Sequence, residues 1–114
     1  MYIVMFVLDD PDLLDKVLDA WDSIGVSGVT IIESTGINRL KLARGVGSPF
    51  MAGMNRLLSS REEGHYTLFT MVPNEEVVAK CLQAAEGIVG DLNDPHSGVL
   101  AAWPVAIIKG VPLE

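Results

Sequence analysis

The stretch YIVMFVLDDPDLLDKVLDAWDSIGVSGVTIIE, at positions 2–33, predicts a strand, a helix and a second strand in succession. Residues 2–8 form a continuous apolar run, which is typical of a central strand that is covered on both faces. Asp10 and Pro11 then supply a helix N-cap and a proline for the first helical position. One apolar face follows at helical spacing, and Gly25 ends the helix. That face consists of Leu13, Leu14, Val17, Leu18, Trp21 and Ile24.

The rest of the chain predicts three more strands and one more helix. Residues 26–33 (VSGVTIIE) and 65–72 (HYTLFTMV) read as the second and third strands. Asn74 caps the second helix, and Gly90 closes it. The apolar face of this helix consists of Val77, Val78, Cys81, Leu82, Ala85 and Ile88. A polar turn at 91–98 leads to a fourth strand at 99–108, in which Pro104 favours an edge position or a bulge.

The two halves of the chain resemble each other weakly. A shift of 64 positions places the first helix on the second, so that apolar, alanine and charged positions coincide. The matched pairs are Leu13 with Val77, Leu14 with Val78, Lys16 with Lys80, Val17 with Cys81, Leu18 with Leu82, Ala20 with Ala84, Asp22 with Glu86 and Ile24 with Ile88. Two such halves predict an α+β fold of the ferredoxin-like β-α-β-β-α-β sandwich type. We expect one domain over residues 1–114, with a long loop between strands 2 and 3.

Composition indicates an oligomer in the cytoplasm. Hydrophobic residues make up 49% of the chain and mean hydropathy is +0.35, so we expect apolar surface to be buried between copies. The net charge of −7 argues against general binding of nucleic acid. The longest apolar run at the start is too short to span a bilayer, which predicts no membrane insertion. A single cysteine, Cys81, cannot form a disulfide framework, and core packing is its expected role.

Positive charge is concentrated in one segment. Residues 39–61 contain no Asp or Glu and hold five of the eight basic residues, Arg39, Lys41, Arg44, Arg56 and Arg61. They lie in the connection 36–64, and a connection of that length in a compact domain tends to be functional. A basic segment in an acidic chain predicts an anionic partner.

Other polar clusters have ordinary structural interpretations. Asp12, Asp15, Asp19 and Asp22 recur at helical spacing and fit the solvated face of a helix. The segment DLNDPHSG at 91–98 is closer to a turn than to a calcium loop. No phosphate-loop, dinucleotide, hydrolase or zinc motif occurs, and the sequence therefore predicts a protein that is not an enzyme.

The second predicted strand and the segment after it resemble a known family. Residues 25–33, GVSGVTIIE, followed by Gly36-Ile37-Asn38-Arg39, resemble the second strand and loop entrance of the nitrogen-regulatory PII signal proteins. The segment PNEEVVAKCLQAAE is similar to the PII helix after the third strand, and the spacing of these landmarks also agrees. The resemblance covers nearly the whole chain.

The resemblance implies a homotrimer that binds adenine nucleotides in clefts between subunits. By this likeness residues 37–64 are a T-loop that docks onto a target protein, and residues 89–98 are a nucleotide-cradling B-loop. The ligand-binding residues it implies, with those of the adjacent turn, are Thr30, Gly36, Asn38, Arg39, Asp94, His96, Ser97, Gly98 and Lys109. Residues for binding the target protein are Lys41, Arg44, Arg56 and Arg61. Ser97, Gly98 and the amides of the 91–98 turn could contact an anion.

The chain also departs from the family pattern. The Gly-Arg-Gln at the loop base is Asn38-Arg39-Leu40 here, no tyrosine occurs in the loop, and no lysine occurs in the B-loop-like segment. We therefore expect a divergent PII-like regulator that binds a small anion such as AMP, ADP or ATP and acts on an unidentified target protein. The alternative is a CutA-like trimer that binds a divalent metal through His65, His96 and the carboxylates of residues 91–94.

Overall fold

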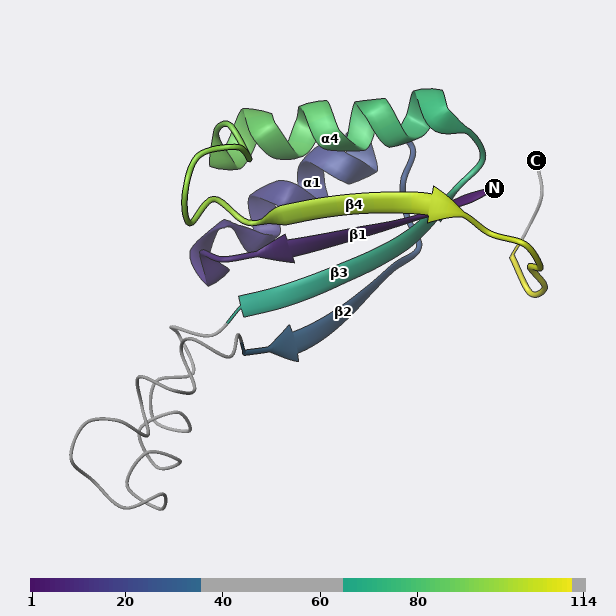
Figure 1. The fold of residues 1–114 in the computed structure, drawn as a ribbon, viewed down its shortest axis with the longest axis horizontal. Helices are drawn as coiled ribbons and strands as arrows, with labels where there is room; N and C mark the ends of the chain where they lie inside the picture. Colours follow the sequence, from purple (N-terminus) through teal and green to yellow (C-terminus); the bar gives the residue numbers. More distant parts are fainter. Residues whose placement is uncertain (36–64, 112–114) are drawn as a thin grey trace, which may run out of the picture.

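A computed structural model describes residues 1–35 and 65–111, and these form a mixed α+β arrangement. The elements in chain order are β1 (Tyr2–Leu8), the short 3-10 helix η1 (Pro11–Leu13), α1 (Leu14–Ser23), β2 (Val29–Ser34), β3 (His65–Val72), α4 (Glu75–Val89) and β4 (Val99–Pro104). The four strands form one antiparallel sheet in the order β2-β3-β1-β4 (Figure 1). The α+β class predicted from the sequence is confirmed.

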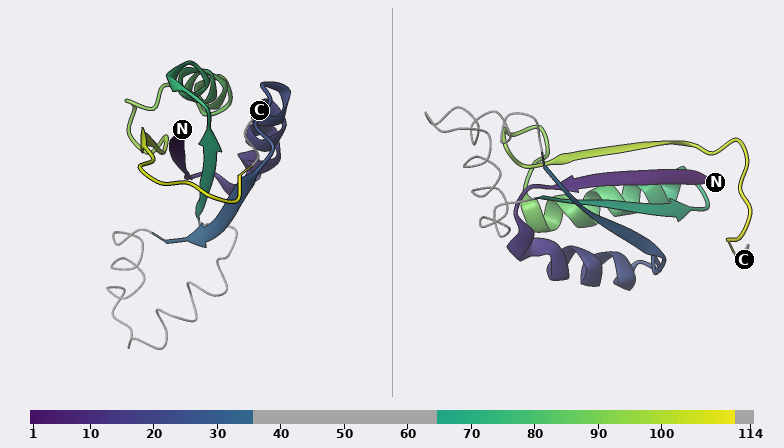
Figure 2. Two further views of the ribbon diagram at one scale, coloured as in Figure 1. Left: turned by 90° about the vertical axis from the view of Figure 1, so that its right-hand side faces the viewer. Right: turned by 90° about the horizontal axis from the view of Figure 1, so that it is seen from below.

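Both helices lie on the same face of the sheet (Figures 1 and 2). Between helices and sheet is a core of fully or nearly fully buried side chains: Val4, Phe6, Leu8, Val17, Trp21, Val26, Leu68, Val72, Cys81 and Ala85. Trp21 lies at its centre, with its ring centroid 6.1 Å from that of Phe6. The indole Nε1 donates a hydrogen bond of 3.2 Å to the carbonyl oxygen of Cys81, which ties α1 to α4. The buried indole nitrogen is therefore satisfied.

The helix ends follow the signals in the sequence. The Asp10 carboxylate accepts the backbone N–H of Asp12 at 3.0 Å, and the Asn74 side chain accepts the N–H of Val77 at the same distance. These contacts satisfy amides that have no partner within the helices. The first helix differs from its prediction in one respect, because its first turn is the 3-10 helix η1.

Two strands are shorter than predicted. β2 begins at Val29 and not at residue 26, because the N–H of Val26 bonds to the Trp21 carbonyl at the end of the helix. β4 ends at Pro104 and not at residue 108. Proline has no N–H to donate to a sheet ladder, and the last backbone bond beside β1 is made by the N–H of Val105 to Met1. The edge position predicted from Pro104 is confirmed.

The prediction that residues 2–8 are covered on both faces is wrong. β1 is central in the sheet, but only its alternate residues Val4, Phe6 and Leu8 are buried. The plan has two long helices and both pack on one face, so the opposite face of β1 is left partly exposed among the described residues.

The weak internal repeat has a structural counterpart. Positions 64 apart are buried together, as in Val17 with Cys81, Trp21 with Ala85, Val4 with Leu68 and Leu8 with Val72. Met5 and Phe69 are also 64 apart and are direct partners in the β1–β3 register. The two halves are therefore related about this pair.

Gly98 brings the loop before β4 into close contact with the end of β1. Its φ is +117°, a backbone conformation that residues other than glycine rarely adopt. A Cβ at this position would clash with the carbonyl oxygen of Val7 and lie 3.4 Å from the ring of Phe6. Only glycine fits here without displacing backbone.

We expect Gly98→Ala to destabilise the protein by about 3 kcal/mol, because the methyl group meets the Val7 carbonyl and the backbone is strained. Gly87→Ala is the matched control. Gly87 lies in α4, where a Cβ would have no neighbouring atom within 4 Å, and alanine there should stabilise by up to about 1 kcal/mol. Urea denaturation monitored by tryptophan fluorescence measures both changes, and equal effects of the two variants would contradict the close approach.

Candidate functional site

The face of the sheet opposite the helices is largely apolar and carries no Asp, Glu, Lys or Arg. The pairing registers place the following residues on this open face: Ile3, Met5 and Val7 from β1, Thr30, Ile32 and Ser34 from β2, His65, Thr67, Phe69 and Met71 from β3, and Val99, Ala101 and Trp103 from β4. None of them is Asp, Glu, Lys or Arg. Ile32, Met71, Val99 and Trp103 are exposed large hydrophobic residues. A contiguous apolar patch of this kind marks an interaction surface.

The sequence contained a signal for this face that our interpretation missed. An apolar strand such as residues 2–8 needs cover on both sides, and the predicted plan offers only two long helices. Two helices packed side by side cover one face of a four-stranded sheet. The described residues therefore leave the other face of the sheet open.

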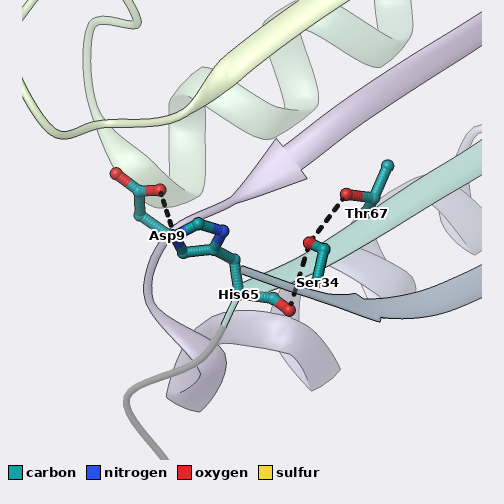
Figure 3. A network of polar contacts seen from close by, with 4 residues as sticks. All are labelled: Asp9, Ser34, His65 and Thr67. Carbon is teal, nitrogen blue, oxygen red and sulfur yellow. Dashed lines mark hydrogen bonds and ion pairs between the residues drawn. The ribbon is translucent and has the colours of Figure 1, made fainter. Parts of the chain in front are cut away.

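A cluster of polar side chains lies at the two residues that flank the connection between β2 and β3 (Figure 3). The Ser34 hydroxyl donates to the carbonyl of His65 at 3.4 Å and shares a hydrogen bond of 2.9 Å with the Thr67 hydroxyl. His65 Nε2 lies 3.9 Å from Asp9 Oδ1, an ion pair when the imidazole is protonated. These contacts join the ends of β1, β2 and β3, and so fix the two points where segment 36–64 leaves and re-enters the sheet.

In residues 89–98, which correspond to the predicted B-loop, backbone N–H groups donate hydrogen bonds to carboxylates of the same chain. The N–H of Leu92 donates to the Glu86 side chain and that of Asn93 to the Asp91 side chain, both at 2.9 Å. The N–H of Asp94 donates to the Asp91 carbonyl at 3.0 Å. These three amides are therefore occupied and do not face an anion. His96 has a left-handed φ of 63° and is exposed, as is Asp94.

Electrostatics in this loop also favour cations over anions. Three carboxylates, those of Glu86, Asp91 and Asp94, surround the turn, and the C-terminal end of α4 carries a partial negative charge. Ser97 and Gly98 are half-buried at the end of the loop. Any positive charge for an anion near them must come from other parts of the chain or from another copy.

The remaining predicted ligand residues lie elsewhere. Thr30 is exposed near the start of β2, and Lys109 is exposed beyond the end of β4. Thr30 lies on the edge strand β2, level with Met5 in the middle of β1, and Lys109 lies past the end of β4, beside the start of β1. The 91–98 loop leads into β4 at the opposite edge of the sheet, where β1 ends (Figure 1). One copy of the chain therefore does not bring these groups together. Gly36, Asn38, Arg39 and the basic residues Lys41, Arg44, Arg56 and Arg61 lie outside the described residues.

The described residues contain no metal centre of the kind the CutA-like alternative requires. Across residues 1–35 and 65–111, no group of three or more His, Cys, Asp or Glu side chains is arranged to hold a metal ion. His65 has Asp9 as its charged neighbour, and His96 is on the exposed turn. In the same ranges no helix combines the length and the apolar character needed to cross a membrane.

Comparison with known proteins does not identify a family. No protein-family model matches the chain, and no curated protein matches it.

Cys81 is placed for packing and not for chemistry. Its side chain is fully buried in the core, and burial raises the pKa of the thiol to about 11. A reactive cysteine has the opposite properties, a lowered pKa and access to solvent. The prediction of a core role for Cys81 is confirmed by its burial.

The Cys81 thiol should make folding stability depend on pH in alkaline solution. Because the thiol titrates near 9 when unfolded and near 11 when folded, its contribution is fully present below pH 9 and is lost between pH 9 and pH 11. The loss should reach about 2 kcal/mol. The hydrogen bond to Glu75 raises the pKa of Tyr2, which also makes stability depend on pH in alkaline solution, so the measurement compares wild type with Cys81→Ala. Parallel stability profiles from pH 8 to 11 would contradict burial of the thiol.

Proposed function

We propose that the chain is a PII-like regulatory protein with a ferredoxin-like fold that works as a homotrimer. In this proposal a small anion, an adenine nucleotide, binds in clefts between subunits, and the basic segment 37–64 acts on a target protein. The observation that carries the proposal is the open sheet face, which is largely apolar and free of Asp, Glu, Lys and Arg on a chain of net charge −7. Such a face is suited to burial between like copies, since acidic surfaces elsewhere repel one another.

The arrangement of strands supports the proposed fold. The order β2-β3-β1-β4, with both helices on one face, is what two joined β-α-β halves produce when their central strands pair. The burial of positions 64 apart in equivalent places supports the same fold. It agrees with the resemblance to PII proteins that residues 25–39 carry.

The separation of the predicted ligand residues supports a cleft between subunits. Within one chain, Thr30 lies on the edge strand β2, and Ser97 and Gly98 precede β4 at the opposite edge of the sheet. Lys109 follows β4, at the other end of that strand. The turn before Gly98 carries carboxylates, so an anion there requires cations from elsewhere. Association of copies provides a way to bring Lys109 or Arg39 of a neighbour to that turn.

Self-association should depend on the open face. We expect Met71→Asp to convert the oligomer to monomers, because Met71 is 42% exposed on this face and a buried unpaired carboxylate is costly. Leu82→Asp is the matched control: Leu82 is similarly exposed, at 37%, but lies on α4. Sedimentation velocity or light scattering distinguishes the two. A monomeric wild type, or an oligomer that tolerates Met71→Asp, would remove the proposal.

Ligand binding should depend on cations at the subunit cleft. We expect AMP, ADP or ATP to raise the melting temperature of the wild type, and Arg39→Ala or Lys109→Ala to lower nucleotide affinity at least tenfold without dissociating the oligomer. Lys80→Ala is the control, because Lys80 lies on α4 and pairs with Glu76 at 3.8 Å. Calorimetry gives the affinities. Absence of binding by all three nucleotides, or equal affinities for all variants, would contradict the nucleotide site.

A further inference from the structure

Two groups of the kind that bind transition metals lie side by side where β1 ends and β3 begins. Asp9 follows the last residue of β1, and His65 is the first residue of β3. Their neighbours Leu8 and Tyr66 are register partners in the sheet. His65 Nε2 lies 3.9 Å from Asp9 Oδ1 (Figure 3). Imidazole nitrogen and carboxylate oxygen are ligands that Zn²⁺ accepts in the same site.

The separation of these two atoms suits a shared cation better than a direct bond. At 3.9 Å the atoms are farther apart than in a hydrogen bond, which spans about 3.2 Å at most. Two ligand atoms bound to one tetrahedral zinc ion at about 2.0–2.1 Å lie about 3.3 Å from each other. The side chains of His65 and Asp9 are 14% and 35% exposed, so a small side-chain rotation brings both onto an ion that enters from solvent.

Hydroxyl groups on the neighbouring strands fix the position of His65. The Ser34 hydroxyl donates to the His65 carbonyl at 3.4 Å and shares a hydrogen bond of 2.9 Å with the Thr67 hydroxyl. Ser34 is also the register partner of His65 at the end of the β2–β3 ladder. Hydrogen bonds around a residue that binds a metal hold its orientation and strengthen binding.

One copy of the chain supplies too few ligands for a stable zinc site. Zinc sites in proteins use three or four protein ligands. Within residues 1–35 and 65–111, no third His, Cys, Asp or Glu side chain joins this pair in the same copy. A zinc ion held by His65 and Asp9 therefore needs ligands from another copy.

The open face brings the pairs of several copies together. β1 and β3 are the central strands of the sheet. The polar residues Ser34, His65 and Thr67 lie toward one end of this face, and Ile3 and Met71 lie at the other. A rotation axis along the central strands joins like ends of neighbouring copies. An axis across the strands would instead bury hydroxyls and imidazole against apolar side chains, which is costly. The first arrangement gathers the His65 side chains of all copies around the axis.

Charge gives a further reason for a cation at this point. Each copy contributes the Asp9 carboxylate, which Asp10 follows in the sequence, and the chain carries a net charge of −7. Carboxylates that are brought together between copies repel one another. A divalent cation bound between them turns this repulsion into attraction. Metal binding and self-association therefore favour each other.

We propose that His65 and Asp9 of the associated copies together form a site for a divalent transition-metal ion of the Zn²⁺ class, at the polar end of the interface between open faces. The site uses neither His96 nor the carboxylates of residues 91–94, and no single copy completes it. This inference rests on the self-association part of the proposed function.

Zinc binding by the two histidine variants tests the site. The chain has two histidines, so His96→Ala is the matched control for His65→Ala. We expect the wild type and His96→Ala to bind one Zn²⁺ per oligomer. His65→Ala and the conservative variant Asp9→Asn should each bind Zn²⁺ at least about 100-fold more weakly. Equilibrium dialysis with metal analysis gives affinity and stoichiometry, and equal affinities of the two histidine variants would overturn the proposal.

Sedimentation with EDTA or with Zn²⁺ separates this proposal from the proposed function. Zinc should tighten the self-association of the wild type about tenfold and leave that of His65→Ala unchanged. The variant Met71→Asp, which we expect to be monomeric, should bind Zn²⁺ as weakly as His65→Ala. A wild-type oligomer that zinc does not tighten, or one tightly bound ion per chain in Met71→Asp, would refute the shared site and leave the proposed function standing. A wild type that is monomeric in both solutions would remove both.

Discussion

The antiparallel pairing of β1 with β3 holds the two halves of this chain together. Each half supplies a strand and a helix, and the register pairs Met5 with Phe69, so that equivalent positions of the halves meet. On one side of this pair the helices close over Val4, Phe6 and Leu68, and the Trp21 indole joins α1 to the backbone of α4. Without the β1–β3 ladder, each half would expose a strand edge and part of its apolar face. The rest of the fold therefore depends on this contact.

The one-sided helix layer leads directly to the functional interpretation. Alternate residues of each strand point to opposite faces, so the strands that fill the core also present Ile3, Met5 and Met71 on the other side. An apolar sheet face on an acidic chain is suited to contact with another copy. The helices carry acidic residues on their outer surfaces, which keeps association away from that side. In the proposed function, self-association follows from which face the helices leave open.

Much of the fold could be predicted from the sequence, because its signals are local. Proline and asparagine at the helix starts, glycine at the helix ends and the apolar runs of β1 and β3 placed those elements closely. The error on β1 arose because a run of apolar residues indicates burial without saying whether the cover comes from the same chain. The end of β4 depended on the contact of Val105 with Met1, which is distant in sequence and which no local pattern contains. The start of β2 depended on the N–H of Val26, which bonds back to the Trp21 carbonyl at the end of the helix. The carboxylate bonds within residues 91–94 likewise depend on the folded turn. The ligand residues predicted by resemblance in segment 36–64 lie outside the described residues.

The pairing of Ser34 with His65 has a consequence for the evolution of this protein. These residues are register partners at the last rung of the β2–β3 ladder, and the hydroxyl of Ser34 also bonds to the carbonyl of His65. Once two chain positions are fixed in this way, the entropy needed to close the intervening loop grows only with the logarithm of its length, about 0.6 kcal/mol for each doubling. Insertions and deletions between Ser34 and His65 therefore change the free energy of unfolding little. A shift of the β2–β3 register by one residue, in contrast, would turn every β2 side chain to the opposite face of the sheet. Evolution can lengthen, shorten or re-sequence that segment to suit new targets while the scaffold beneath it stays the same.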